Sequence, residues 1–285
     1  MINKLVIIGV GLIGGSFALA LREAGLVREV VGVGRSAENL SAALGMYVID
    51  RYAEAAQAVQ DADVVLLAVP VGQMGPMMAA IAPHLAPHTI VTDVGSTKQD
   101  VVALARANLA QHIAQFVPGH PIAGAERSGV KAARGDLFRE RNVVLTPLPE
   151  TNPEARELIA QLWQGCGAKV SEMAPTLHDE VFAAVSHLPH LLAFGLVDYI
   201  AAQPNAEALF GFAASGFRDF TRIAGSSPEM WRDICLANRD ALLQQLAGYE
   251  AELARIKQLI EGGDGAALAQ LFAAARDARQ KHLSS

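Results

Sequence analysis

Short apolar runs alternate with helix-like segments over the first hundred residues of the chain. The runs are rich in valine, isoleucine and leucine, which predicts strands, and the segments between them have the composition of helices. The predicted strands are 4–10, 29–34, 48–51, 62–70 and 89–95, with two more at 142–147 and 168–173. Uninterrupted apolar strands that alternate with helices are typical of a parallel sheet covered on both faces. The sequence therefore predicts an α/β fold for this part.

The pattern changes after Pro175, where long helical segments follow and no strand is predicted. Segment 178–203 is helical with Pro189 inside it, so we expect a kink near His187. Segment 227–263 is predicted as one helix, from a Ser-Pro start to a glycine pair. We place the domain boundary near Pro175, which gives an N-terminal domain over 1–175 and a helical domain over 176–285.

An apolar stripe follows the second half of this predicted helix. Its residues recur three and four positions apart: Leu242, Leu246, Tyr249, Leu253, Ile256 and Ile260. Such a stripe needs an apolar surface to pack against. Either a helix of another chain or a surface within the monomer provides it.

Composition and charge disfavour several classes of protein. Hydrophobic residues make up 52% of the chain, and the net charge of -6 disfavours nucleic acid or an anionic membrane as the main partner. Cys166 and Cys235 lie far apart without metal-binding spacing, which predicts two reduced thiols and no metal site. No charged leader precedes the first predicted strand, and no uncharged apolar run approaches the length of a membrane span. We therefore expect a cytoplasmic protein without a membrane partner.

A G-x-G-x-x-G pattern follows the first predicted strand and opens a helix, which is the context of a dinucleotide-binding loop. Gly9 permits the tight turn, Gly11 lets a pyrophosphate approach the backbone, and Gly14 lets the helix pack on the strand. With Leu12 and Ile13 between the last two glycines, the free N–H groups at the start of the helix would bind the phosphates.

The residues at the end of the second predicted strand indicate which dinucleotide binds. An acidic residue there would hold the ribose 2′-hydroxyl of NAD, but the chain has Gly34, Arg35 and Ser36. Arg35 can pair with a 2′-phosphate, which favours NADP or the use of both cofactors; the alternative is NAD with Arg35 in solvent. Val69 and Pro70, at the end of the fourth predicted strand, are expected against the nicotinamide ribose.

Segment 118–129, PGHPIAGAERSG, predicts an irregular loop that fixes a histidine. Pro118 and Pro121 each lack a backbone donor, and His120 stands between them. Ser96 follows the strand 89–95 at the carboxyl edge of the predicted sheet, where open α/β folds bind ligands. It either caps the next helix or also touches the substrate or nicotinamide.

Four ordered motifs follow the glycine loop: TDVGSTK, GHPIAGAERSG, HDEVFAAVSHLPH and FRDFTRIAGSSPEMW. Together they resemble the prephenate dehydrogenase family, which includes arogenate and cyclohexadienyl dehydrogenases, over nearly the whole chain. The resemblance implies oxidative decarboxylation of prephenate to 4-hydroxyphenylpyruvate, or of arogenate to tyrosine, with NAD or NADP. It also implies a Rossmann-type dinucleotide-binding domain followed by an all-helical dimerisation domain that forms a homodimer.

The resemblance carries roles onto individual residues. The catalytic residues it implies are His120 and Ser96, and the substrate-binding residues are Arg222, His190, His187, Trp231 and Glu126, with Asp179 as a second acid near the pocket entrance. Ala125 departs from the polar residue that many relatives carry there, which leaves side-chain selectivity open.

The chemistry of this reaction explains these residue types independently of the resemblance. A neutral histidine can accept the proton of the substrate's ring alcohol near pH 7, so His120 fits a general base. Arg222 offers a two-pronged contact to a carboxylate, and His190 a second contact if protonated or as a neutral donor. His187 either binds substrate or satisfies a carbonyl at the kink, and Trp231 either recognises the ring or packs in the core.

Two other functions remain open at this point. One is a β-hydroxyacid-type dehydrogenase, which would use a lysine of the helical domain as acid and base, but segment 178–190 has none. The other is a dinucleotide-sensing regulator without catalysis, which would not need His120 or Arg222.

Overall fold

The computed structural model describes residues 1–125 and 127–283 of the chain. Its main sheet is parallel, with the strand order β3-β2-β1-β4-β5-β6. The strands are β1 (Ile2–Ile8), β2 (Val27–Val33), β3 (Arg51–Tyr52), β4 (Val64–Leu67), β5 (Ile90–Asp93) and β6 (Phe116–Val117). This order is that of a doubly wound Rossmann sheet, in which the direction of winding reverses between β1 and β4. The predicted α/β fold is confirmed.

Helices cover both faces of this sheet because its strands are apolar on both sides. In β1, Leu5 and Ile7 belong to one buried cluster and Val6 and Ile8 to another. The helices of this part are α1 (Leu12–Glu23), α2 (Ala37–Gly45), α3 (Ala55–Ala58), α4 (Val71–Ile81), α5 (Gln99–Asn108) and α6 (Pro153–Gly165), with 3₁₀ turns η1 (Ala82–His84), η2 (Ala110–Gln115) and η3 (Val130–Ala132). Helices α1 and α6 contribute to the first cluster, α4 and α5 to the second.

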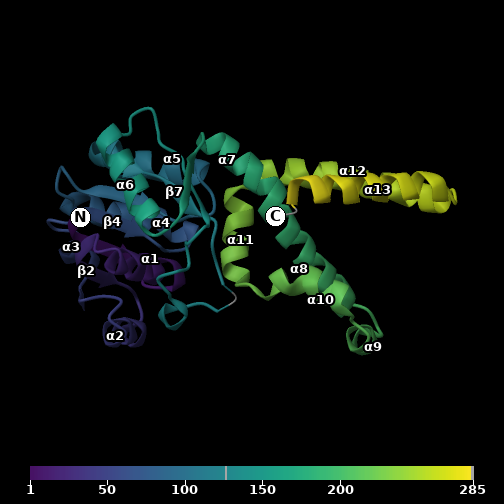
Figure 1. Cartoon of the computed structure of the whole chain (residues 1–285), viewed down its shortest axis with the longest axis horizontal. Helices are drawn as coiled ribbons and strands as arrows, with labels where there is room; N and C mark the ends of the chain where they lie inside the picture. Colours follow the sequence, from purple (N-terminus) through teal and green to yellow (C-terminus); the bar gives the residue numbers. More distant parts are fainter. Residues whose placement is uncertain (126, 284–285) are drawn as a thin grey trace. The chain divides into compact units, whose positions relative to one another are not determined.

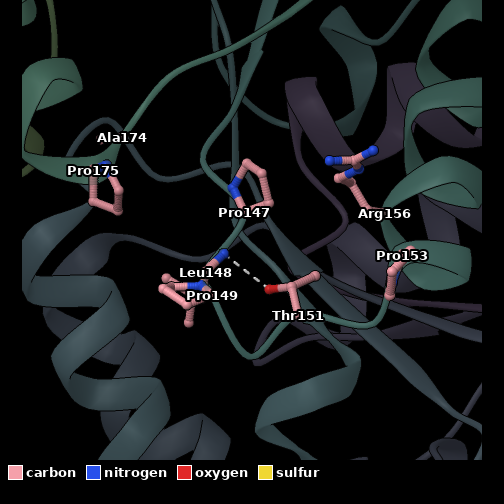
Figure 2. A pocket seen from close by; sticks show the side chains of 8 residues that line it. All are labelled: Pro147, Leu148, Pro149, Thr151, Pro153, Arg156, Ala174 and Pro175. Atoms are coloured by element: carbon pink, nitrogen blue, oxygen red, sulfur yellow. Dashed lines mark hydrogen bonds between the residues drawn. The ribbon is translucent and has the colours of Figure 1, made fainter.

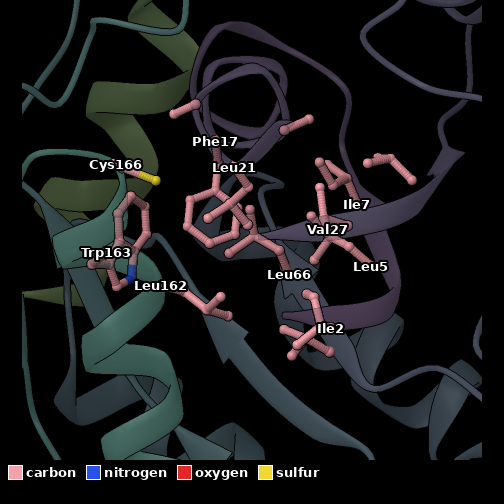
Figure 3. Close-up of a cluster of buried hydrophobic side chains, with 14 of the residues drawn as sticks. Ile2, Leu5, Ile7, Phe17, Leu21, Val27, Leu66, Leu162, Trp163 and Cys166 are labelled. Atoms are coloured by element: carbon pink, nitrogen blue, oxygen red, sulfur yellow. The ribbon is translucent and has the colours of Figure 1, made fainter. Parts of the chain in front are cut away.

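Phe17 of α1 and Trp163 of α6 form the aromatic centre of the first cluster, with their rings 4.4 Å apart (Figure 3). Cys166 lies beside them and is buried, whereas Cys235 is half-buried, and both are free thiols as expected. Because burial raises the pKa of the Cys166 thiol, this side chain acts as a small apolar residue of the core.

A second, three-stranded sheet contains His120 and corrects the sequence analysis. Its order is β7-β8-β9, with β7 (Gly119–Pro121) antiparallel to β8 (Asn142–Leu145) and β9 (Lys169–Glu172) parallel to β8. His120 was predicted in an irregular loop, but it pairs with Val144 in the middle of β7. An edge strand tolerates proline because one side of it needs no donors, which explains why Pro121 does not prevent pairing.

From Pro175 onward the chain is helical. Its elements are α7 (Pro175–Phe182), a π-helical segment η4 (Ala183–His187), α8 (Leu188–Ala201), α9 (Ala206–Gly211), α10 (Ser215–Thr221), a 3₁₀ segment η5 (Arg222–Gly225), α11 (Pro228–Ala237), α12 (Arg239–Glu261) and α13 (Gly265–Leu283). The expected irregularity near His187 is the π-helical segment, which ends two residues before Pro189.

One helical segment among the described residues, Pro175–Ala201, is long and apolar enough to cross a membrane by length and composition alone. From the sequence, no uncharged apolar run of this length was expected. The segment also carries two fully buried histidines, His178 and His187, and the buried Asp179. These polar groups form hydrogen bonds within the protein, which is typical of a helix that packs in a folded domain.

The helix predicted over 227–263 is two helices, α11 and α12, with Asn238 between them. The Asn238 side chain is buried and donates to the backbone oxygen of Asp179 over 2.8 Å, so it holds the break in place. The chain divides into two compact units, Met1–Arg239 and Asp240–Ser285. Within the second unit a turn at Gly262–Asp264, with Gly263 at φ 65°, joins α12 to α13 (Figure 1).

Candidate active site

The glycine loop lies at the carboxyl end of β1. Gly9 has φ 99°, and a Cβ there would stand 2.3 Å from the oxygen of Ala68. A Cβ on Gly14 would stand 2.6 Å from the oxygen of Gly9, so α1 is packed against this turn. Around Gly11, by contrast, no described atom lies within 4 Å of a Cβ. The loop is therefore closed toward the protein at Gly9 and Gly14 and open at Gly11.

The first turn of α1 faces the same open space. Gly11 is its N-cap and has no side chain to bond the first N–H groups of Leu12 and Ile13, both half-buried residues. Such N–H groups and the positive end of the helix dipole bind phosphates. The residues at this turn fit the pyrophosphate of a dinucleotide.

The end of β2 brings Gly34, Arg35 and Ser36 to the surface, and all three are exposed. The Ser36 hydroxyl accepts from Asn39 N over 3.1 Å and so caps α2. A cavity of about 250 Å³ begins beside Ser36. Its lining residues come from α2 and from the segment before and within η3: Ser36, Glu38, Asn39, Ala42, Ser128, Gly129, Val130 and Lys131.

Val69 and Pro70 follow β4 beside the glycine loop. The Cγ1 of Val69 is 3.2 Å from the position of a Cβ on Gly9, and Pro70 is the exposed N-cap residue of α4. The structure thus brings the residues expected around the cofactor to one edge of the sheet, at the switch point between β1 and β4.

A buried ion pair fixes the strand of His120 to the end of β5. Lys98 Nζ bonds Asp93 Oδ2, and it also donates to the oxygen of Gly119 over 2.8 Å. Asp93 Oδ1 accepts from Gly119 N over 3.1 Å, and its other oxygen accepts from Gly95 N. Both atoms of the Gly119 peptide are therefore held, directly before His120.

His120 is buried, with 9% of its surface exposed. Its Nδ1 lies 2.8 Å from Nε2 of His178, and the ring packs edge-on against Phe182 at 4.8 Å. Burial, followed by the charges of His178, Lys98 and His187, holds the pKa of His120 well below its usual value. His120 is accordingly a neutral imidazole at neutral pH, as a proton acceptor requires.

His178 and Lys98 are site residues that the sequence analysis missed. His178 Nδ1 lies 2.8 Å from Asp179 Oδ1, so Asp179 is fully engaged inside the protein instead of standing at a pocket entrance. The signal for both residues was present, because each belongs to a motif that carries the family resemblance. Their contacts with the strand of His120, from His178 to His120 itself and from Lys98 to Gly119, join residues too far apart in sequence for a local pattern to reveal them.

Three candidate residues gather around α8 and α11. The His190 ring stacks on Trp231 at 3.7 Å, and His190 Nδ1 lies 2.8 Å from the oxygen of Ser186. Because a carbonyl oxygen only accepts, Nδ1 carries the proton and Nε2 of the neutral ring is an acceptor. Burial, together with the positive charge of Arg222, lowers the pKa of His190. Arg222 thus stands close to His190, with its side chain exposed.

His187 is completely buried, and its Nδ1 lies 3.1 Å from Nδ2 of Asn238. Burial lowers its pKa to about 4, while the backbone of Ser96 opposes that shift. Ser96 is half-buried beside this ring, and no hydrogen bond joins it to His120 within the described part of the chain. Glu126, the remaining candidate, lies outside the described residues.

A larger cavity, of about 520 Å³, lies elsewhere (Figure 2). It is lined by Pro147, Leu148, Pro149, Thr151, Pro153, Arg156, Ala174 and Pro175. Thr151 Oγ1 accepts from Leu148 N there, which closes a turn between two of the lining residues. None of these residues is a predicted site residue, so the larger cavity is not the place where the candidates converge.

A Rossmann sheet with a glycine loop, followed by helices that meet a buried neutral histidine near its carboxyl edge, defines a dinucleotide-dependent dehydrogenase. Comparison with known proteins specifies the family. Residues 17–172 match the family described as prephenate dehydrogenase, nucleotide-binding domain, and residues 174–274 match prephenate dehydrogenase, dimerization domain. The chain belongs to the prephenate dehydrogenase family.

Individual relatives agree over nearly the whole chain. A prephenate dehydrogenase of Bacillus subtilis is 40% identical over 98% of this chain and 76% of its own length. A cyclohexadienyl dehydrogenase of Zymomonas mobilis is 37% identical over 97% of this chain and 95% of its own. The crystal structure of prephenate dehydrogenase from A. aeolicus, in complex with hydroxyphenyl propionate and NAD+, is 36% identical, with a TM-score of 0.92 over 99% of this chain and 98% of that one.

Proposed function

We propose that this chain oxidatively decarboxylates prephenate or arogenate with NAD or NADP, as a step of tyrosine biosynthesis. The observation that carries the proposal is His120, a buried neutral imidazole that the bonds of Gly119 hold next to Asp93, at the carboxyl end of β5 in the main sheet. Family membership supports this reaction over the β-hydroxyacid and regulator alternatives. Relatives named as prephenate, cyclohexadienyl and arogenate dehydrogenases leave both substrates in the proposal.

The reaction needs one proton acceptor and a place for two negative charges. The oxidised nicotinamide supplies the acceptor for the hydride that leaves the ring carbinol carbon, while the ring carboxylate departs as carbon dioxide. His120 accepts the proton of the ring hydroxyl. Ser96, half-buried at the carboxyl edge of the sheet, is proposed to bond the same hydroxyl.

The substrate is proposed to bind along α8, η5 and α11. Arg222 offers its guanidinium to a substrate carboxylate, and Trp231 a ring face next to His190. A neutral His190 accepts at Nε2, so it suits a hydroxyl or ammonium donor of the substrate and contacts a carboxylate only when protonated. His187 is proposed to hold α8 against α11 at this substrate site through its hydrogen bond with Asn238. Glu126 stays a prediction.

The cofactor is proposed to bind with its pyrophosphate on Gly9, Gly11 and Gly14, beside Leu12 and Ile13, and its nicotinamide ribose near Val69 and Pro70. For the adenosine end we favour NADP. Exposed Arg35 stands next to the cavity that Ser36 and Lys131 line, and no acidic side chain occupies the end of β2 itself. NAD without a carboxylate partner is the alternative.

The helical part is proposed to form a homodimer, with the domain boundary near Pro175. The match to a dimerization domain over 174–274 supports this, as do exposed apolar side chains in the same part. Examples are Phe212, which is 89% exposed, and Tyr199 and Ile260, which are both 63% exposed. Burial of such residues between subunits would also account for the apolar character of segment Pro175–Ala201, with no need for a membrane. We therefore propose a cytoplasmic location.

The deciding experiment is an assay of reduced nicotinamide by absorbance, with prephenate and arogenate each combined with NAD and with NADP. Turnover in any combination supports the reaction, and the pattern assigns both specificities. If the protein binds dinucleotide but shows no turnover in any combination, the proposed reaction is wrong.

A further inference from the structure

His120, His178 and Asp179 form one continuous chain of hydrogen bonds. His120 Nδ1 lies 2.8 Å from His178 Nε2, and His178 Nδ1 lies 2.8 Å from Asp179 Oδ1. All three side chains are buried, with His178 and Asp179 at 0% and 1% exposed. Phe182 packs against both imidazoles, at 4.8 Å and 4.5 Å. The orientation of each ring is thus fixed by packing as well as by bonding.

Asp179 determines which atom donates in each of these hydrogen bonds, because a carboxylate can only accept. Its two oxygens take the backbone N–H groups of Lys98 and Gln99, each over 2.8 Å, at the start of α5. Burial alone would raise the pKa of Asp179, but the bonds from His178 and from these backbone groups outweigh it and lower the pKa. Asp179 is therefore a carboxylate, and His178 Nδ1 must carry the proton that lies between them.

The position of the proton on His178 then determines which atom donates in its hydrogen bond with His120. Burial lowers the pKa of His178, an effect that its bond to Asp179 opposes, so the ring is neutral at neutral pH and has its one proton on Nδ1. Its Nε2 is then an acceptor, and His120 Nδ1 must be the donor. A neutral His120 has no second proton, which leaves the lone pair on Nε2.

We propose that His178 and Asp179 are positioning residues that hold His120 in its Nδ1–H tautomer, so that Nε2 is the atom that takes the substrate proton. This rests on the proposed function. As the O–H bond of the substrate breaks, its proton moves to Nε2. The cation that results keeps its Nδ1–H bond to His178, which carries no charge of its own. The positive charge of Lys98 disfavours a protonated His120, so the acceptor on His178 is needed to stabilise this state.

The test compares two replacements of His178. His178→Phe keeps a ring of similar size but removes the acceptor, whereas His178→Gln offers a side-chain oxygen near the position of Nε2. We expect His178→Phe to lower kcat about 100-fold, with KM and dinucleotide affinity within about twofold, and His178→Gln to recover most of that loss. Phe182→Leu, which changes packing on the same two rings but no hydrogen bond, is the matched control and should lose far less.

A second readout does not depend on the reaction. Long-range ¹H–¹⁵N NMR of the histidine rings should report His120 of the unaltered protein as the Nδ1–H tautomer, and His178→Phe should shift it toward Nε2–H or a mixture. An Nε2–H ring in the unaltered protein would overturn the proposal, as would unchanged kcat in a folded His178→Phe. An Nδ1–H ring in a protein inactive on every substrate would overturn the proposed function instead and leave the assigned tautomer standing.

Discussion

Lys98 and Asp93 form an ion pair in which both side chains are completely shielded from solvent. A buried pair of this kind keeps its charges only when further hydrogen bonds satisfy them, and here the Gly119 peptide supplies bonds to both partners. Since Gly119 precedes His120, the pair fixes where the catalytic candidate enters the site. The position of His120 is set by β5 and the turn after it, not by the irregular residues that follow in the sequence.

His120→Asn should lower turnover by about 100-fold or more, because the amide cannot accept a proton at neutral pH. Dinucleotide affinity should stay within about twofold, since the glycine loop is untouched. Steady-state kinetics and fluorescence titration of the reduced dinucleotide measure the two effects. Unchanged turnover in a folded variant would remove His120 from the mechanism.

The glycine loop allows a paired test of cofactor binding. Gly11→Ala adds a Cβ where no described atom lies within 4 Å, so stability should stay within about 0.5 kcal/mol while dinucleotide affinity falls at least about tenfold. Gly14→Ala places a Cβ 2.6 Å from the Gly9 oxygen and should lower the free energy of unfolding itself. Urea denaturation without cofactor separates the two. Normal dinucleotide affinity in Gly11→Ala would place the pyrophosphate elsewhere.

The sequence predicted β1, β2, β4 and β5 because each lies in an apolar, β-branched run. It did not predict the two-residue strand β6, and it placed β3 at 48–51, whereas the strand is Arg51–Tyr52. It did not predict β7, because a three-residue edge strand that ends in Pro121 shows neither apolar alternation nor length. It also missed the contacts of His178 with His120 and of Lys98 with Gly119, which join residues 58 and 21 positions apart. Pairing between distant residues is decided by how the sheets pack, and single-sequence patterns report only local preference.

Arg35→Ala should weaken NADP binding at least about tenfold and change NAD binding little, because a lost charge-assisted bond affects only the 2′-phosphate. Binding constants for the two dinucleotides, measured by the same titration, test this. Arg28→Ala, at the opposite end of β2 and also exposed, is the matched control. Equal losses for NAD and NADP would contradict a 2′-phosphate contact.

Arg222→Gln should raise KM roughly 10- to 100-fold with a smaller effect on kcat, which corresponds to the loss of one or two charge-assisted bonds to a carboxylate. Arg232→Gln is the control, because Arg232 directly follows the motif that contains Arg222 but pairs with Asp233 at the surface. Initial rates over a range of substrate concentrations give both constants. If KM is unaltered in Arg222→Gln, the guanidinium does not bind substrate.

The buried histidines predict how stability changes with pH. His187 has its pKa lowered from 6.5 to about 4 by burial, so the folded state disfavours its protonation while the unfolded state does not. Stability is therefore complete above pH 6.5 and falls as the pH drops toward 4, by roughly 3 kcal/mol at most for this residue. The pKa values of His120 and His178 are lowered too, so they add losses of the same sign.

Urea denaturation at several pH values between 7.5 and 4.5 measures this slope. His187→Asn removes the titrating ring and keeps a side-chain oxygen to accept from Asn238, so the decline with pH should become shallower. His88→Asn, at an exposed position, should leave the slope as it is. If His187→Asn shows the same slope as the unaltered protein, burial does not hold His187 neutral. The buried contact between His187 and Asn238 is then not a source of the acid sensitivity.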